Sequence, residues 1–296
     1  MLKRTLSLIL ALSLALALAA SAEIQSTDML GRAHALKAPA SRVVALSAAE
    51  CEILYALGAG STLVGRGEFC DYPAEVTSLP SLGSGGNTNI EEILALKPDL
   101  VLMDSMAQPA EQVEAIEKAG VPVYVTQATD ISGVYNAIAG IGQVLGKDNE
   151  AQALVDSMKA TFDQVKARVP AGGAPKTVYF EVSPLQYGLW TAGKGTFMNE
   201  MAGMLGLKNI FDDVDGWAEV SQEQVIARNP DLIVTVAMYA GQGQKPDEEI
   251  ASRAGWDGIA AVKNKAILTA DNNAMTRPGP RLAEAAQSLY DFAYGG

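Results

Sequence analysis

Short apolar runs and amphipathic stretches alternate along the first half of the chain. Residues 26–48 have the pattern of a hairpin that leads into a strand at 42–46. A helix is predicted over 49–57, where glycines end it, and a further strand over 63–65. The same alternation continues to about residue 125. Strands that alternate with helices predict a parallel sheet with helices on both of its faces.

Residues 131–169 interrupt this alternation with one helical stretch that is broken near 146–148. Its second part carries apolar residues at helical spacing, which are Ala151, Leu154, Val155, Met158, Phe162, Val165 and Val169. The strand pattern then resumes at 177–182. The sequence therefore predicts an α/β fold with two Rossmann-like lobes, over 23–146 and 171–296, joined by one long helix over 147–170.

An internal repeat supports two lobes of similar architecture. Residues 89–102 align without a gap to residues 221–234, and both copies read as a helix, a Pro-Asp turn and an apolar strand. The alignment pairs Glu91 with Glu223. The alternative is chance recurrence of a common helix-turn-strand unit.

The two paired glutamates have a local and a functional interpretation. Asn89 and Ser221 are good N-caps, and Glu92 and Gln224 would complete capping boxes. Glu91 and Glu223 are then left at the second helical position, where the helix dipole stabilises each by roughly 0.3–1 kcal/mol. In open α/β sheets this end of the helix lies at the ligand-binding edge. Two carboxylates on two facing rims suit docking to a pair of basic sites on a partner.

The N-terminus has the pattern of a signal peptide. Lys3 and Arg4 precede an apolar run over residues 6–20, and residues 20–22 form a small-x-small cleavage site. The alternative is a membrane anchor, for which the run is short. Cys51 is the first cysteine, so no lipid-attachment cysteine is expected. We predict cleavage near Ala22 and a periplasmic protein.

Composition narrows the partners and the chemistry. The chain has 22 Lys and Arg against 34 Asp and Glu, a formal net charge of −12, and nucleic-acid binders need a basic face. In an oxidising compartment Cys51 and Cys70 could form a disulfide, which would stabilise the fold by roughly 3 kcal/mol. The alternative is that they remain two buried thiols. The single histidine, His34, is expected on the surface, and no cluster has the spacing of a metal site or a cofactor site.

One motif suggests an enzyme. Gly188 is followed after four residues by Gly193-Lys194-Gly195, as in a phosphate-binding loop. That motif requires Ser or Thr after the lysine, to hold magnesium, and here Gly195 takes the place. No serine or cysteine nucleophile with a histidine base is evident. We expect no catalytic residues.

Together these segments resemble the ABC-importer solute-binding proteins that carry vitamin B12, haem and iron-siderophores. The segments that carry the resemblance are 28–32, 42–46, 71–73, 89–101, 220–225 and 277–281. The resemblance implies the class III periplasmic binding protein fold, a monomer, and a ligand held between the lobes. It also implies that Glu91 and Glu223 engage arginines of the membrane permease. A sensing or surface module of the same fold is the alternative.

The resemblance also implies a set of ligand-binding residues. Three aromatic residues, Phe69, Trp190 and Trp217, match positions that contact the corrinoid in cobalamin-binding members. Tyr187 and Tyr239 are further aromatic candidates. Cobalamin-binding members have additional tryptophans near residues 83–88 and 104–105, which this chain lacks. The ligand stays open among a corrinoid as first choice, an iron-siderophore or haem, and an oxyanion.

Arg277 and Arg281 lie at the start of the final predicted helix. Arginine side chains bind carboxylates and phosphates through paired hydrogen bonds, so both are candidates for contact with an anionic ligand. The alternative is a salt bridge within the acidic C-terminal lobe.

Overall fold

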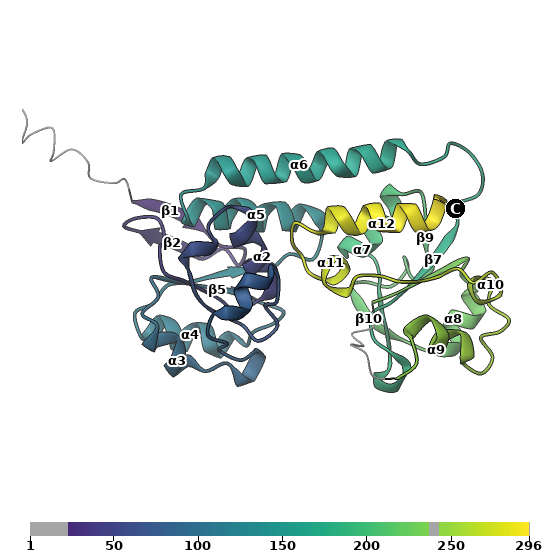
Figure 1. Cartoon of the computed structure of the whole chain (residues 1–296), viewed down its shortest axis with the longest axis horizontal. Helices are drawn as coiled ribbons and strands as arrows, with labels where there is room; N and C mark the ends of the chain where they lie inside the picture. Colours follow the sequence, from purple (N-terminus) through teal and green to yellow (C-terminus); the bar gives the residue numbers. More distant parts are fainter. Residues whose placement is uncertain (1–22, 237–242, 296) are drawn as a thin grey trace, which may run out of the picture.

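The first half of the chain forms a parallel α/β lobe. The computed structural model describes residues 23–236 and 243–295 (Figure 1). An antiparallel hairpin precedes a four-stranded parallel sheet of order β4-β3-β5-β6. The strands are β1 (Ile24–Thr27), β2 (Ala33–Leu36), β3 (Val43–Ala45), β4 (Leu63–Arg66), β5 (Leu100–Asp104) and β6 (Val123–Thr126). The helices are α2 (Ala48–Ala56), α3 (Ile90–Ala95), α4 (Ala110–Lys118) and α5 (Ile131–Val144), with 3-10 turns η1 (Gly60–Thr62), η2 (Ala74–Ser78) and η3 (Gly85–Asn87).

The second half forms another parallel sheet, of order β12-β11-β7-β9. Two further strands, β8 and β10, make a separate antiparallel ribbon. The strands are β7 (Thr177–Glu181), β8 (Leu189–Ala192), β9 (Lys208–Asn209), β10 (Trp217–Val220), β11 (Leu232–Thr235) and β12 (Ile267–Thr269). The helices are α7 (Phe197–Met204), α8 (Gln222–Arg228), α9 (Pro246–Ser252), α10 (Ala260–Lys263), α11 (Asn272–Thr276) and α12 (Leu282–Tyr294), with the turn η4 (Leu185–Tyr187).

The long helix α6 (Asp148–Ala167) runs along both lobes. It packs on α5 of the first lobe and on α12 of the second (Figure 1). Its 20 residues correspond to about 30 Å at 1.5 Å per residue. The buried members of the predicted stripe are Ala151, Val155, Met158, Phe162 and Val165. One cluster of buried apolar residues extends from the first lobe through this helix into the second. The predicted fold class is confirmed.

The predicted repeat has a physical basis in the structure. After α3, Lys97 has φ 50°, and after α8 the matching Asn229 has φ 44°. The repeated aspartates fix the neighbouring strands, because Asp99 accepts hydrogen bonds from the backbone N–H groups of Ser41 and Arg42. Asp231 does the same for Thr177 at 2.8 Å. Each repeat therefore ties a helix end to the start of an adjacent strand.

Two local expectations were wrong. His34 is 8% exposed rather than on the surface, because its Nε2 lies 3.2 Å from Asp28 Oδ2 inside the hairpin. At α3, Asn89 accepts a hydrogen bond from the Glu92 N–H, and the described residues contain no return bond from the Glu92 side chain. The capping box at Ser221 and Gln224 is complete.

The two cysteines lie together in the core of the first lobe. Both are free thiols in the structure, not the expected disulfide, and both are buried. Each Sγ lies 3.8 Å from the carbonyl oxygen of Ala45. The hydrogen bond with Cys70, followed by burial, raises the pKa of the Cys51 thiol well above its usual range. Because the sulfurs share one site, the disulfide between them stays a prediction.

Candidate ligand site between the two lobes

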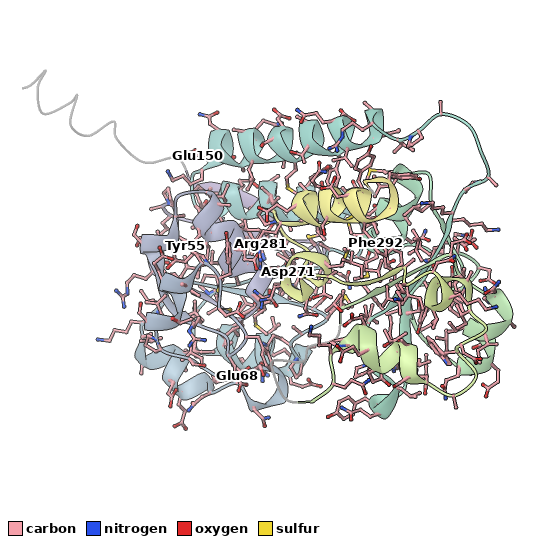
Figure 2. All side chains as sticks on the ribbon, turned by 45° about the vertical axis from the view of Figure 1, so that its right-hand side comes forward. Tyr55, Glu68, Glu150, Asp271, Arg281 and Phe292 are labelled. Carbon is pink, nitrogen blue, oxygen red and sulfur yellow. The ribbon has the colours of Figure 1, made fainter. Side chains whose placement is uncertain are left out.

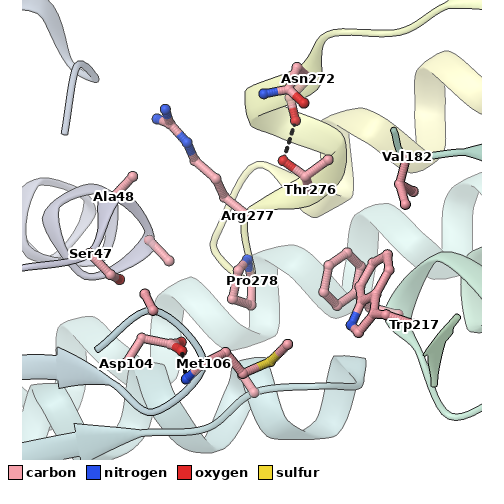
Figure 3. Close-up of a pocket in the computed structure, with 14 residues that line it drawn as sticks. Ser47, Ala48, Asp104, Met106, Val182, Trp217, Asn272, Thr276, Arg277 and Pro278 are labelled. Atoms are coloured by element: carbon pink, nitrogen blue, oxygen red, sulfur yellow. Dashed lines mark hydrogen bonds between the residues drawn. The ribbon is translucent and has the colours of Figure 1, made fainter. Parts of the chain in front are cut away.

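A cavity of about 390 Å³ lies where the lobes meet, and both lobes line it (Figure 3). The first lobe contributes Asp104 and Met106, at and just beyond the carboxyl end of β5, and Ser47 at the start of α2. Carboxyl ends of parallel strands are where open α/β sheets bind ligands. The second lobe contributes Trp217 and Arg277. The cavity therefore has the position and the two-sided lining of a ligand site.

An aromatic pair forms the wall contributed by the second lobe. Trp217 packs edge-on against Phe197, with ring centroids 5.5 Å apart and an interplanar angle of 64°. The Phe197 N–H donates to the carbonyl of Thr129, which ties the start of α7 to the first lobe. Trp217 is half-buried and begins strand β10. Such a wall offers a flat, fixed apolar surface to a large ligand.

Two carboxyl groups lie on the opposite side. Asp104 is 7% exposed, and its Oδ1 accepts from the Met106 N–H at 2.7 Å. Behind it, Glu50 is fully buried; its carboxyl group accepts from the Ser47 N–H and lies 3.0 Å from Thr126 Oγ1. Burial raises the pKa of Asp104. Burial raises the pKa of Glu50 well above its usual range, and the charge of Asp104 adds to that effect.

An ion network beside the cavity joins the lobes. Glu52 of α2, with its side chain 2% exposed, accepts from Arg277 Nη1 at 2.9 Å and from Arg281 Nη2 at 2.6 Å. Arg277 also contacts Asp71 at 2.7 Å. The Arg281 guanidinium stacks 4.1 Å from the ring centroid of Tyr72. Figure 2 shows Arg281 at the junction of the two lobes.

This network shows which carboxylates Arg277 and Arg281 pair with. Their main carboxylate partners Glu52 and Asp71 come from the first lobe, so the alternative of a salt bridge within the C-terminal lobe is wrong, and contact of either arginine with a ligand stays a prediction. The one acidic neighbour from their own lobe is Asp271, 4.0 Å from Arg281 among the described residues. Arg277 lines the cavity, whereas Arg281 lies outside it.

The predicted aromatic residues do not all meet at the cavity. Trp217 lines it, whereas Phe69, Tyr187 and Trp190 are 67%, 74% and 40% exposed and lie outside its lining. The Phe69 carbonyl accepts from Arg277 Nη2 at 3.1 Å, which holds that loop against the second lobe. Tyr239 falls outside the described residues.

The phosphate-loop motif has a different structure. The Gly193 N–H donates to Gly216 O at 2.8 Å, and the Lys194 N–H donates to Val214 O at 2.7 Å. These donors are therefore used within the protein and do not face an anion. Within residues 23–236 and 243–295, no group of three or more His, Cys, Asp or Glu side chains could hold a metal ion. In the same ranges, no helix has both the length and the apolar character to cross a bilayer.

Sequence reasoning missed three groups of the site. Asp104 was detectable, because it ends a predicted strand at the sheet edge that binds ligands. Phe197 follows a good N-cap, Thr196, but nothing local indicates which neighbour it faces. Glu52 resembles any other glutamate of a helix, and its partners lie 225 and 229 residues away.

Comparison with known proteins agrees with this geometry. The chain is 36% identical to an uncharacterized ABC transporter substrate-binding lipoprotein of Bacillus subtilis, covering 88% of this chain and 82% of that one. It is 30% identical to the vitamin B12-binding protein of Salmonella paratyphi A, covering 84% and 89%. The crystal structure of a possible iron-binding, periplasmic solute-binding protein from Staphylococcus epidermidis matches with a TM-score of 0.74 and 34% identity, covering 87% and 100%.

A protein-family model also matches this chain. The model for periplasmic binding proteins matches residues 43–274, which include both sheets, the helix α6 that joins the lobes, and most of the cavity lining. The chain therefore belongs to the periplasmic binding protein family.

Proposed function

We propose that this protein is the extracytoplasmic solute-binding component of an ABC importer, which captures a metal-chelate nutrient between its lobes and delivers it to a membrane permease. The observation that carries the proposal is the cavity at the lobe junction, lined by Asp104 and Met106 from one lobe and by Trp217 and Arg277 from the other. Relatives described as vitamin B12-binding, haem-binding and Fe³⁺-hydroxamate transport proteins support this ligand class.

Within that class we place a corrinoid first and an iron-siderophore or haem second. The Trp217–Phe197 wall suits any of these flat or rigid chelates. Phe69, Tyr187 and Trp190 are exposed, so they are available to the part of a large ligand that extends beyond the cavity. Arg277 and Arg281 then position the two lobes around the ligand.

A thermal-shift panel tests this function. A ligand that binds only the folded state raises the unfolding temperature according to RT ln(1 + [L]/Kd), so a cognate chelate stands out from the rest. The panel consists of cobalamin, cobinamide, haem, ferric siderophores and simple oxyanions. A shift with a corrinoid supports the first choice, and a shift with a ferric chelate alone replaces it. No shift with any chelate contradicts the proposed function.

The same proposal gives Glu91 and Glu223 the role of docking residues. Both side chains are exposed, and both occupy the second position of the repeated helices α3 and α8. In Figure 1 both helices lie on the side of the molecule away from α6. A backbone hydrogen bond to the carboxyl group lowers the pKa of Glu223, which favours its charged form.

We expect the double variant Glu91→Ala, Glu223→Ala to abolish most transport and to keep ligand affinity, because neither residue lines the cavity. Each rim charge lost lowers the association rate with a basic partner. Uptake in cells and ligand binding by the purified protein are the two measurements. Glu150→Ala with Glu248→Ala, exposed glutamates of α6 and α9, is the charge-matched control. Transport that survives the docking variant contradicts this role.

The remaining parts of the proposal concern the mature protein. We propose that it acts after export and cleavage near Ala22, as a monomer over lobes 23–146 and 171–296, with Cys51 and Cys70 oxidised to a disulfide. It would carry no catalytic activity and bind no nucleic acid. A sensing module of the same fold would bind the same chelates without supporting uptake, so the transport assay separates the two.

A further inference from the structure

The charged side chains that line the cavity differ in whether a neighbouring group of opposite charge balances them. Asp104 and Arg277 are the only charged side chains in the described lining. Arg277 has two carboxylate partners, Glu52 at 2.9 Å and Asp71 at 2.7 Å, and it also donates to Phe69 O. Three of its five N–H groups therefore already have partners within the protein, and its charge is balanced by Asp71 and by Glu52, which it shares with Arg281.

Among the described residues, Asp104 has no cationic partner of this kind. Its hydrogen bonds come from uncharged groups, namely the backbone of Met106 and Ala107 and the hydroxyl of Thr126. No Lys, Arg or His in the described part of the chain forms an ion pair with it. The group directly behind it is Glu50, another carboxyl. In Figure 3 the Arg277 guanidinium points away from Asp104.

A nearly buried carboxyl group in this setting discriminates strongly between ligands. An amide, a hydroxyl or a cation of the ligand would satisfy the lone pairs of Asp104 with a charge-assisted hydrogen bond. A ligand carboxylate would bring a second negative charge next to Asp104, and the one cation of the described lining, Arg277, is already paired with two carboxylates. Most of the remaining lining, such as Trp217, Phe197 and Met106, is apolar, and its polar members Ser47, Asn272 and Thr276 are uncharged.

We infer that Asp104 is a specificity-determining residue, which makes this site select neutral or cationic chelates with hydrogen-bond donors over chelates that present carboxylates. The inference rests on the proposed function and narrows its ligand class. Within that class it favours amide-bearing corrinoids and ferric hydroxamates over haem and over ferric chelates of polycarboxylic acids.

Binding by the purified wild-type protein is the first test, with cobinamide and a ferric trihydroxamate on one side and haem and ferric citrate on the other. We expect at least one donor-bearing chelate to bind about tenfold or more tightly than either carboxylate-bearing one. Asp104→Asn keeps an acceptor for the Met106 N–H but removes the charge, and should weaken the donor-bearing chelate about tenfold to hundredfold. Asp163→Asn, an exposed aspartate of α6, is the matched control.

A second variant tests the charge without changing Asp104. Ala107 is exposed and lines the cavity, so Ala107→Lys adds a cation beside the carboxylate with little risk to the fold. It should strengthen binding of haem or ferric citrate, whereas Ala107→Gln should not. Tighter wild-type binding of carboxylate-bearing chelates, or a preference unchanged in both charge variants, overturns the inference and leaves the proposed function standing. No binding of any chelate overturns the proposed function itself.

Discussion

Glu50 is a carboxyl group without access to solvent, and it makes folding stability depend on pH. Burial raises its pKa well above the ordinary value of 4.5. The folded protein therefore keeps a proton that the unfolded chain releases. The stability that Glu50 contributes is fully present at pH values below its pKa in the unfolded chain. It is lost as the pH rises through its pKa in the folded protein. The contribution of Asp71 to folding stability has the opposite dependence on pH. Burial raises its pKa, but Arg277 more than offsets this and lowers it, so its contribution is lost as pH falls.

We expect Glu50→Gln to remove the loss of stability on the alkaline side. Glutamine offers an oxygen to the Ser47 N–H and an amide to Thr126 Oγ1, so both contacts persist. The free energy of unfolding of the variant, relative to wild type, should rise as the pH increases above the ordinary glutamate pKa of 4.5. Urea titrations across this range measure it, and Glu114→Gln, a mostly exposed glutamate, is the control. A difference that stays constant with pH contradicts the raised pKa.

Single residues were predicted from sequence only where the signal was local. The strand predicted at 177–182 contains Tyr179 and Phe180, which are fully buried because a central strand covered on both faces buries its side chains. His34 was not placed correctly and the carboxylate partners of Arg277 were not foreseen, since both depend on tertiary packing. Asp28 lies across the hairpin from His34, and Glu52 lies in the other lobe from Arg277.

The repeated helices α3 and α8 end in the same way. Each closes on a residue with positive φ, Lys97 or Asn229, before the aspartate that fixes the next strand. Asparagine tolerates this conformation, whereas a lysine is strained in it by roughly 1–2 kcal/mol. One copy of the repeat therefore has the residue suited to the turn, and the other does not.

Lys97→Asn should stabilise the first lobe by about 0.5–1 kcal/mol, because it places the tolerant residue at the strained position. The Lys97 carbonyl that accepts from Arg42 belongs to the backbone and is retained. Chemical denaturation of the variant beside Lys97→Ala separates relief of strain from loss of the lysine side chain, since alanine has no preference for positive φ. Equal stability of the two variants would show that the turn is unstrained.

Whole elements were predicted well, because periodicity is a property of consecutive residues. The predicted helix over 49–57 is α2 at 48–56, and the predicted strand over 177–182 is β7 at 177–181. The ribbon of β8 and β10 was missed as a unit. In this ribbon Ala192, the last residue of β8, pairs with Trp217, the first residue of β10, and 24 residues lie between them in the sequence. Pairing over such a distance leaves no local pattern in the sequence.

Besides the Phe197–Thr129 hydrogen bond, two larger sets of contacts hold the two lobes together. Helix α6 packs on α5 and α12, and the Glu52 network connects α2 to α12 and to the segment before it. The sequence predicted the long helix from its apolar stripe. It could not predict the network, because charge pairs between lobes depend on how the finished sheets face each other.

We expect Glu52→Gln to destabilise the protein by about 3 kcal/mol or more, because it leaves two partly buried arginines without their shared carboxylate. Calorimetry should show a lower unfolding temperature. Glu68→Gln, an exposed glutamate of the same lobe, is the control. A transition unchanged from wild type would mean that solvent and the remaining partners Asp71 and Asp271 compensate fully.

The single core that passes through α6 has a consequence for any membrane partner. Halves that share buried side chains resist rotation against one another, so loading alters the outline of the molecule only slightly. A permease that grips both rims would then hold full and empty carriers almost equally well. Under the proposed function, directional uptake would then arise after contact, when the membrane complex separates the two lobes and releases the ligand.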